Sequence, residues 1–292
     1  MRITLAICLC VAGATLAGTS ELKAEDACPA NSLGVSRTAE VDTTGGPWFG
    51  EPHGNRDFLA PGEVVLTFDD GPVPRYTRPI LAALAAQCTK ATFFMVGEMI
   101  AEYPDGVREV AAAGHTIGTH TWTHHNLKRL SEEQGKAQIE STIAAAEKAA
   151  GQPIAPFFRY PYLSDTPAIV AYLQSRNIGQ FAIDVDSFDW RTRSPSRVVQ
   201  TVMAGLERRG RGIILFHDIH ASTVQALPEL LSQLKAKGYK VVHLRPKTPV
   251  VAITSYAVPT KESMREGRPR ASHRHGVTRV KATRRSAQWS VW

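Results

Sequence analysis

The amino-acid sequence predicts an α/β protein built on a parallel sheet or barrel. Short apolar segments rich in β-branched and aromatic residues alternate with helical segments between residues 62 and 244. This alternation is typical of parallel sheets whose strands are buried on both faces. Seven or eight strand-and-helix steps in roughly 185 residues favour a small barrel.

Seven segments have the composition of buried strands. In the first, a β-rich apolar run ends at two adjacent carboxylates, and Gly71 and Pro72 then break the strand. We expect the strands at Glu63–Phe68, Lys90–Val96, His115–Thr119, Phe157–Arg159, Gly179–Asp184, Gly212–Phe216 and Tyr239–Leu244.

Six segments between these strands are expected to be helical. Ser131 is a natural N-cap for the longest of them, an Ala-rich helix that Gly151 should end. The helices are expected at Thr77–Gln87, Glu98–Ala113, Ser131–Ala150, Thr166–Arg176, Pro195–Arg208 and Thr223–Lys237.

The formal net charge of +7 at pH 7 belongs to the C-terminal tail. Residues 261–292 contain nine Lys or Arg and two Glu, so residues 1–260 balance at zero and offer no basic surface for nucleic acid. We expect an extended lead-in over 25–60, one domain over 61–246, and a disordered tail over 247–292 that has too few apolar residues to fold. The tail could contact an anionic polymer or a membrane surface, or could be a solvated appendage.

Residues 1–24 have the pattern of a secretory signal peptide. Arg2 supplies a positive start, Ile3–Ala17 is apolar and rich in small residues, and cleavage could follow Ala17 or Ala24. An uncleaved membrane anchor is the alternative, although the apolar run is short for a span. We therefore expect a secreted, periplasmic or cell-envelope protein, and a monomer.

Cleavage of such a signal peptide would remove two of the four cysteines. Cys28 and Cys88 would remain, and they could form a disulfide in an oxidising compartment. Two separate thiols are the alternative, since the sequence does not give the distance between them.

Polar residues gather directly after the predicted strands. The carboxyl ends of strands in α/β barrels and open parallel sheets form the edge where active sites lie. This recurrence points to one site more strongly than any single motif does. The residues are Asp69 and Asp70 after the first strand, His120 and His124 after the third, Arg159 and Tyr162 after the fourth, Asp186, Asp189 and Trp190 after the fifth, and His217 and Asp218 after the sixth.

His120 and His124 could be metal ligands or ordinary core and surface histidines. Together with a carboxylate from the same edge they would give three protein ligands and leave room for a water molecule, as catalytic zinc sites require. Non-haem iron uses a similar triad. A metal in this position would lower the pKa of its water towards neutrality.

The remaining groups also have structural alternatives. Arg159 and Tyr162 could end a strand, or could pair with a carboxylate and direct a backbone N–H at an oxyanion. Asp189 and Trp190 could form a polar turn, or could orient a histidine and provide an apolar wall. His217 could be a buried structural residue, or a general acid whose tautomer an Asp fixes.

The five groups together resemble one family, the NodB-like polysaccharide deacetylases of carbohydrate esterase family 4. The resemblance covers roughly residues 60–245 and lies in five motifs that occur in the family's order. They are Thr67–Gly71 (TFDDG), His120–His124 (HTWTH), Arg159–Tyr162 (RYPY), Asp186–Trp190 (DSFDW) and Leu215–His217 (LFH).

The resemblance implies an irregular (β/α) barrel of the NodB homology type that removes the acetyl group from N-acetylated sugars. It implies that Asp69 is the general base and that Arg159 holds it in place. Asp70, His120 and His124 would bind one divalent metal ion, usually zinc.

The resemblance also implies the roles of the other site residues. The backbone N–H of Tyr162 would stabilise the oxyanion, and His217, oriented by Asp189, would protonate the leaving amine. Trp190 and Leu215 would enclose the acetyl methyl group.

The activity predicted by the resemblance is the release of acetate from N-acetylglucosamine-type sugars of peptidoglycan or a chitin-like glycan. A non-catalytic module that binds cell-wall glycans on the same fold is the main alternative, because a fold does not fix a function. An iron oxygenase is a second alternative. The motifs do not specify which glycan is bound.

Overall fold

The computed structural model describes residues 28–52, 58–253 and 255–256. Its strands form one ten-stranded sheet in which the order along the main path is β1-β10-β3-β4-β5-β6-β7-β2, and β9 joins β3 to β8. All strand pairs in this part of the chain are parallel. The predicted fold class is confirmed as an α/β protein with an irregular, barrel-like sheet that does not close.

The strands are short, and β3 lies at their centre. It pairs with β4, β9 and β10, and all of its residues are buried. The strands are β1 (Arg37–Val41), β2 (Trp48–Phe49), β3 (Glu63–Asp69), β4 (Thr92–Met95), β5 (Thr116–Thr119), β6 (Phe157–Phe158), β7 (Gly179–Phe181), β8 (Val185–Asp186), β9 (Gly212–His217) and β10 (Lys240–Pro246).

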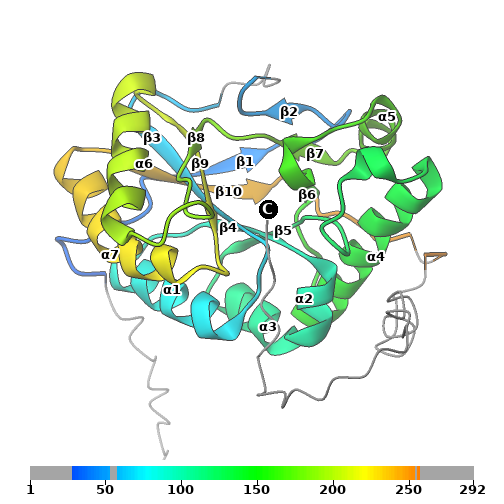
Figure 1. Cartoon of the computed structure of the whole chain (residues 1–292), viewed down its shortest axis with the longest axis horizontal. Helices are drawn as coiled ribbons and strands as arrows, with labels where there is room; N and C mark the ends of the chain where they lie inside the picture. The colour runs from blue at the N-terminus through cyan, green and yellow to red at the C-terminus, as the bar shows by residue number, and fades with distance from the viewer. Residues whose placement is uncertain (1–27, 53–57, 254, 257–292) are drawn as a thin grey trace, which may run out of the picture.

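The helices lie outside the strands and surround much of the sheet (Figure 1). Ser131 caps α4 as predicted: it forms a capping box with Gln134, and Gly151 ends the helix in a left-handed conformation. The helices are α1 (Pro74–Ala86), α2 (Gly97–Glu102), α3 (Pro104–Ala112), α4 (Glu132–Ala150), α5 (Pro167–Ser175), α6 (Pro195–Arg209) and α7 (Ala221–Ala236), with 3₁₀ turns at Leu127–Arg129 and Pro161–Leu163. None of the helices in the described ranges has the length and apolarity needed to cross a membrane.

The segment predicted as one helix over Glu98–Ala113 is two helices. The chain leaves the helical conformation at Tyr103 (φ −129°), and Pro104 begins α3. A proline disfavours the helical conformation of the residue before it and lacks the N–H that a continuous helix would use. The prediction therefore overlooked the break that Pro104 causes.

The alternation of side chains along β3 decides what faces the interior of the barrel. Val64, Leu66 and Phe68 belong to the core shared with the helices, whereas Val65 belongs to the smaller core inside the barrel. Because side chains alternate along a strand, Asp69 lies on the same inner face as Val65. The strand thus delivers a carboxylate into the apolar interior.

The segment predicted as an extended lead-in contributes two strands. β1 pairs with β10, and β2 pairs with β7. Their brevity and the turn residues around them left no periodicity in the sequence from which they could be recognised. The predicted signal peptide, residues 1–24, lies outside the described residues and stays a prediction.

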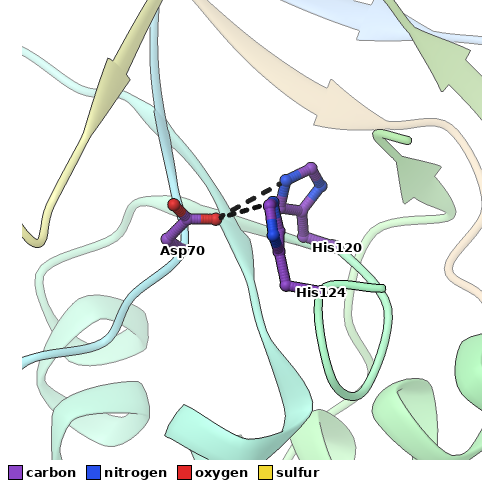
Figure 2. Close-up of side chains that lie close together, drawn as sticks. All are labelled: Asp70, His120 and His124. Atoms are coloured by element: carbon purple, nitrogen blue, oxygen red, sulfur yellow. Dashed lines mark ion pairs between the residues drawn. The ribbon is translucent and has the colours of Figure 1, made fainter. Parts of the chain in front are cut away.

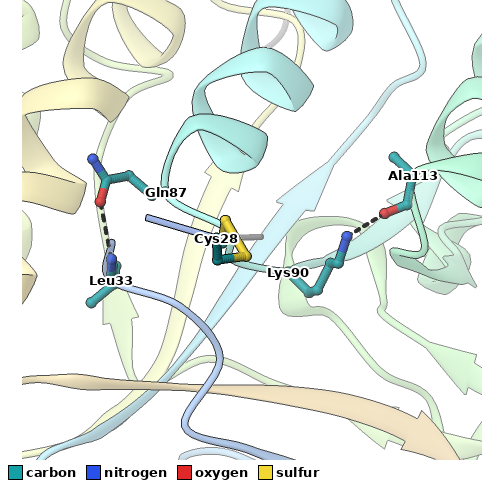
Figure 3. Close-up of a disulfide and its surroundings, with 6 residues drawn as sticks. Cys28, Leu33, Gln87, Lys90 and Ala113 are labelled. Carbon is teal, nitrogen blue, oxygen red and sulfur yellow. Dashed lines mark hydrogen bonds between the residues drawn. A yellow bond between two sulfur atoms is a disulfide. The ribbon is translucent and has the colours of Figure 1, made fainter. Parts of the chain in front are cut away.

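Cys28 and Cys88 form a disulfide, which decides between the two alternatives that the sequence left open. Their Cα atoms are 5.8 Å apart, and the bond joins the N-terminal segment to the end of α1 (Figure 3). Gln87 binds the same segment, since its side-chain oxygen accepts a hydrogen bond from the N–H of Leu33 at 3.1 Å. Cross-links of this kind typically stabilise a fold by about 2–4 kcal/mol.

Ordered contacts continue past Pro246, where the domain was predicted to end. Val250 is buried, and its N–H donates to the carbonyl of Ile154. Arg176 donates to the carbonyl of Val251 at 2.7 Å, and the N–H of Ile253 donates to Glu140 at 3.0 Å. The rest of the predicted disordered tail, apart from Ser255 and Tyr256, lies outside the described residues.

These contacts predict where the chain can be shortened. A protein ending at Tyr256 should retain full thermal stability, because it keeps the buried Val250 and the bonds to α4 and α5. Ending the chain at Pro246 should cost about 2–3 kcal/mol, or roughly 5–10 °C in melting temperature, from lost apolar burial and unpaired polar groups. Thermal unfolding of the two truncated proteins and the full chain measures this. Equal melting temperatures would show that residues 247–256 add nothing to stability.

Candidate active site

Two adjacent carboxylates diverge at the end of β3. Asp69 is the last residue of the strand, and Asp70 follows it in a left-handed conformation with φ 77°. A strand would place the two side chains on opposite faces, but the left-handed turn redirects the second one. The N–H of Asp70 donates to the carbonyl of Phe94 at 3.2 Å, which fixes this turn against β4.

Asp70, His120 and His124 form a cluster of three potential metal ligands (Figure 2). Oδ1 of Asp70 lies 3.6 Å from Nε2 of His120 and 3.4 Å from Nε2 of His124. His120 directly follows β5. His124 has a left-handed backbone conformation (φ 56°), which turns the chain so that its ring lies near that of His120. The structure therefore brings together the three residues predicted to bind a metal.

The chemistry of this cluster fits a divalent cation. Burial lowers the pKa of His120 to about 3 and also lowers that of His124, so both imidazoles are neutral and can offer lone pairs. Nδ1 of His120 hydrogen-bonds to the carbonyl of Arg159 at 2.6 Å, which leaves Nε2 free to face Asp70. Oδ1 of Asp70 is buried and has no hydrogen-bond partner within the described chain. A bound cation would satisfy this oxygen.

Asp69 is bound by a buried arginine. Arg159 donates to Oδ1 of Asp69 at 2.7 Å and to the hydroxyl of Thr67 at 2.8 Å, and its guanidinium lies over the ring of Phe94. Burial raises the pKa of Asp69 to about 6, although the charge of Arg159 opposes this rise. A carboxylate with a pKa near neutrality is suited to accept and release a proton. Oδ2 of Asp69 lies 3.7 Å from Nε2 of His120.

His217 is paired with Asp189 on the opposite side of the site. Nδ1 of His217 lies 2.7 Å from Oδ1 of Asp189, and Oδ2 of Asp189 accepts the N–H of His217 and the hydroxyl of Thr223. Burial by itself would lower the pKa of His217, but its pairing with Asp189 and the nearby carboxylates of Asp70 and Asp69 together raise the pKa to about 10. At neutral pH the imidazole is therefore protonated and can donate a proton.

The three residues predicted to contact the substrate lie around this centre. Tyr162 is exposed and left-handed (φ 60°), and its ring lies 4.9 Å from that of His124. Trp190 is 39% exposed, and its indole N–H points to Asp186 at 3.5 Å. Leu215 is buried on β9, two residues before His217.

Asp218 is a site residue to which the sequence assigned no role. Its carboxylate accepts the N–H of Gly71 at 3.0 Å and the hydroxyl of Thr77 at 2.5 Å, and its own N–H donates to the carbonyl of Asp69. A Cβ on Gly71 would lie 2.0 Å from this carboxylate, so only glycine fits there. Asp218 follows His217 in the sequence, but no spacing could indicate that it holds the loop after β3.

Comparison with known proteins gives the family. Residues 59–180 match the family model described as polysaccharide deacetylase. The structure resembles a family 4 carbohydrate esterase from Streptomyces lividans, with 32% sequence identity and a TM-score of 0.56 over 66% of this chain and 99% of that one. The chain belongs to the polysaccharide deacetylase family. The resemblance inferred from the five motifs is confirmed.

Other members of the family differ in length and in activity. A peptidoglycan deacetylase of Bdellovibrio bacteriovorus is 36% identical, with a TM-score of 0.68 over 75% of this chain and 62% of that one. A pseudoenzyme of the family from Bacillus anthracis is 28% identical, with a TM-score of 0.56 over 63% of this chain and 68% of that one. Among the first curated relatives are peptidoglycan deacetylases of Bacillus and Listeria, and this chain spans 37–66% of their length.

The geometry of the cluster predicts which substitutions remove a bound metal. Replacing Asp70, His120 or His124 with Ala should each reduce zinc binding by at least tenfold, because each removes one of three ligands. Asp69→Asn should keep near-stoichiometric zinc, because the side chain keeps its shape and is not one of the three. Metal content after dialysis against zinc, measured by mass spectrometry, gives the answer. Loss of zinc in Asp69→Asn with retention in Asp70→Ala would reverse the assignment of the two carboxylates.

Proposed function

We propose that this protein is a metal-dependent hydrolase that removes the N-acetyl group from N-acetylglucosamine-type sugars of a glycan and releases acetate. One observation carries the proposal. A carboxylate with a pKa near 6, a cluster of three potential metal ligands and a protonated imidazole lie at the carboxyl ends of β3, β5 and β9. A proton acceptor, a Lewis-acid site and a proton donor are what amide hydrolysis requires.

The metal of this proposal is a divalent cation held by Asp70, His120 and His124. Zinc suits two imidazoles and one carboxylate, and three protein ligands leave a position open for the reaction. When bound, the cation supplies Lewis-acid activation of water and of the acetyl carbonyl.

The side chains of this protein would move the protons. Asp69, held by Arg159, takes a proton from the attacking water while the oxygen of the water bonds to the amide carbon. The backbone N–H of Tyr162 stabilises the negative charge that develops on the former carbonyl oxygen. His217 delivers its proton to the sugar nitrogen, the C–N bond breaks, and acetate and a free amine result. Trp190 and Leu215 enclose the acetyl methyl group.

The relatives support this activity and leave an alternative to be tested. The names of several relatives describe deacetylases of peptidoglycan or of chitin oligomers, which share an N-acetylated sugar. The pseudoenzyme relative supports the alternative, a module that binds cell-wall glycan without turnover. Against this alternative, the base, the three ligands and the acid are all present in this chain. The disulfide and the predicted signal peptide support a location in the cell envelope or outside the cell.

Release of acetate tests the proposal directly. We expect the zinc-loaded protein to release acetate from N-acetylglucosamine oligomers or from peptidoglycan fragments. Asp69→Asn should reduce kcat by about 10²–10⁴ with its zinc retained, because Asn cannot accept the proton. Acetate is quantified by an enzyme-coupled assay, with metal content measured in parallel. Binding of glycan and zinc without acetate release from any of these substrates would favour the non-catalytic module.

The pairing of His217 with Asp189 predicts the alkaline side of the pH profile. Because the pKa of His217 is raised to about 10, the acid stays protonated as pH rises through neutrality, and it loses its proton only near pH 10. Asp189→Asn removes the negative partner, so the alkaline limb of kcat should move down by at least two pH units. Asp105→Asn, which makes the same charge change on exposed α3, should leave the limb in place. An unchanged limb in Asp189→Asn would exclude this role for the pair.

A further inference from the structure

A cavity that the proposed mechanism does not use is formed in part by the loop that carries Asp189. It has a volume of about 320 Å³ and is formed by the loop after β8 and the first turns of α6; its lining residues are Phe188, Arg191, Thr192, Arg197 and Thr201. This volume is at the lower end of the range for ligand pockets. Phe188 directly precedes Asp189, the partner of His217, so the loop that carries Asp189 also forms part of the cavity wall.

The loop that forms this cavity carries two exposed aromatic rings, Phe188 and Trp190. Phe188 is 40% exposed and is held in a left-handed conformation (φ 51°), which bulky residues rarely adopt. Its N–H donates to Asp186 at 2.7 Å, which fixes the turn. The ring of Phe188 lies 6.0 Å from that of Trp190. The chain thus keeps two apolar faces exposed next to a polar site, an arrangement that suits the C–H face of a sugar ring.

The cavity also carries two arginines and no acidic side chain. The guanidinium of Arg191 lies over the rings of Phe188 and Trp190, at 5.8 and 5.4 Å from their centroids. Arg197 is exposed in the first turn of α6. Within the described residues neither guanidinium forms an ion pair. Arginine binds carboxylates through two parallel N–H bonds, and stacking on a ring leaves that edge free.

We propose that this cavity is an acidic-sugar subsite, which binds the carboxylate of a sugar residue near the one that is deacetylated. The inference rests on the proposed function and narrows its substrate class. In peptidoglycan every second sugar carries a lactyl ether whose carboxylate is free or is extended by a peptide with carboxylates of its own. Chitin carries no carboxylate. The acidic-sugar subsite therefore selects glycans of the peptidoglycan type.

Steady-state kinetics on two substrates tests this selection. The double variant Arg191→Gln/Arg197→Gln should raise KM for muramic-acid-containing oligosaccharides about tenfold or more, because charged hydrogen bonds are lost. Its kcat on them, and its kinetics on chitin oligomers of the same length, should change less than about twofold. Arg208→Gln/Arg209→Gln, at the far end of the same helix, makes the same change in charge and should leave both substrates unaffected.

Binding measured by calorimetry separates this inference from the proposed function. The ligands are a disaccharide with a free lactyl carboxylate, its methyl ester, and a disaccharide that carries the peptide. Wild type should bind either acidic ligand at least tenfold more tightly than the ester, and the Arg191/Arg197 variant should not discriminate. Whichever of the two acidic ligands binds with the higher affinity shows whether the lactyl or the peptide carboxylate is bound.

Two results would overturn the acidic-sugar subsite. One is an equal rise in KM for acidic and neutral oligosaccharides in the Arg191/Arg197 variant. The other is equal affinity of the wild-type protein for the acidic disaccharide and its methyl ester. If wild type releases no acetate from any substrate, the proposed function fails, and the calorimetry still decides whether the subsite exists.

Discussion

The site depends on one buried ion pair, between Arg159 and Asp69. Arg159 is fully buried inside the barrel, and a buried charge that lacks a partner is strongly destabilising. Its guanidinium binds Asp69 on β3 and also the carbonyls of Phe181 and Ala182, at the end of β7. Its own carbonyl accepts the hydrogen bond of His120. One residue therefore sets the position of the base and the orientation of a metal ligand.

The site also depends on different environments for the two neighbouring carboxylates, Asp69 and Asp70. Asp69 faces the apolar interior, where burial raises its pKa. Asp70 turns towards His120 and His124; burial would raise its pKa too, but the positive charge of His217 helps to lower it. The left-handed turn that separates them is held by Asp218, through the N–H of Gly71. Repulsion between the two groups is thus accommodated by the fold: arginine neutralises one, and the metal would neutralise the other.

The sequence predicted the parts of the molecule that follow from local pattern. Strands such as β3 and the cap of α4 at Ser131 are strong local signals, and the order of polar residues after the strands predicted that they would meet. Other features depend on contacts between distant residues. Nothing local indicates that β2 pairs with β7, or that Asp218 holds Gly71. The break at Pro104 was a local signal, but the apolar period on either side of it favoured one continuous helix.

The pairing of β1 with β10 has a consequence for how the protein is made. Arg37–Val41 hydrogen-bonds to the strand that ends at Pro246, so the first and last strands of the sheet are neighbours. That ladder cannot form until almost the whole domain has been synthesised, and contacts between residues so far apart in sequence slow folding. Until β10 is synthesised, the part of β3 that pairs with it would stay exposed in the nascent chain. Completion of the sheet therefore waits for the last strand of the domain, whatever the order in which the other strands pair.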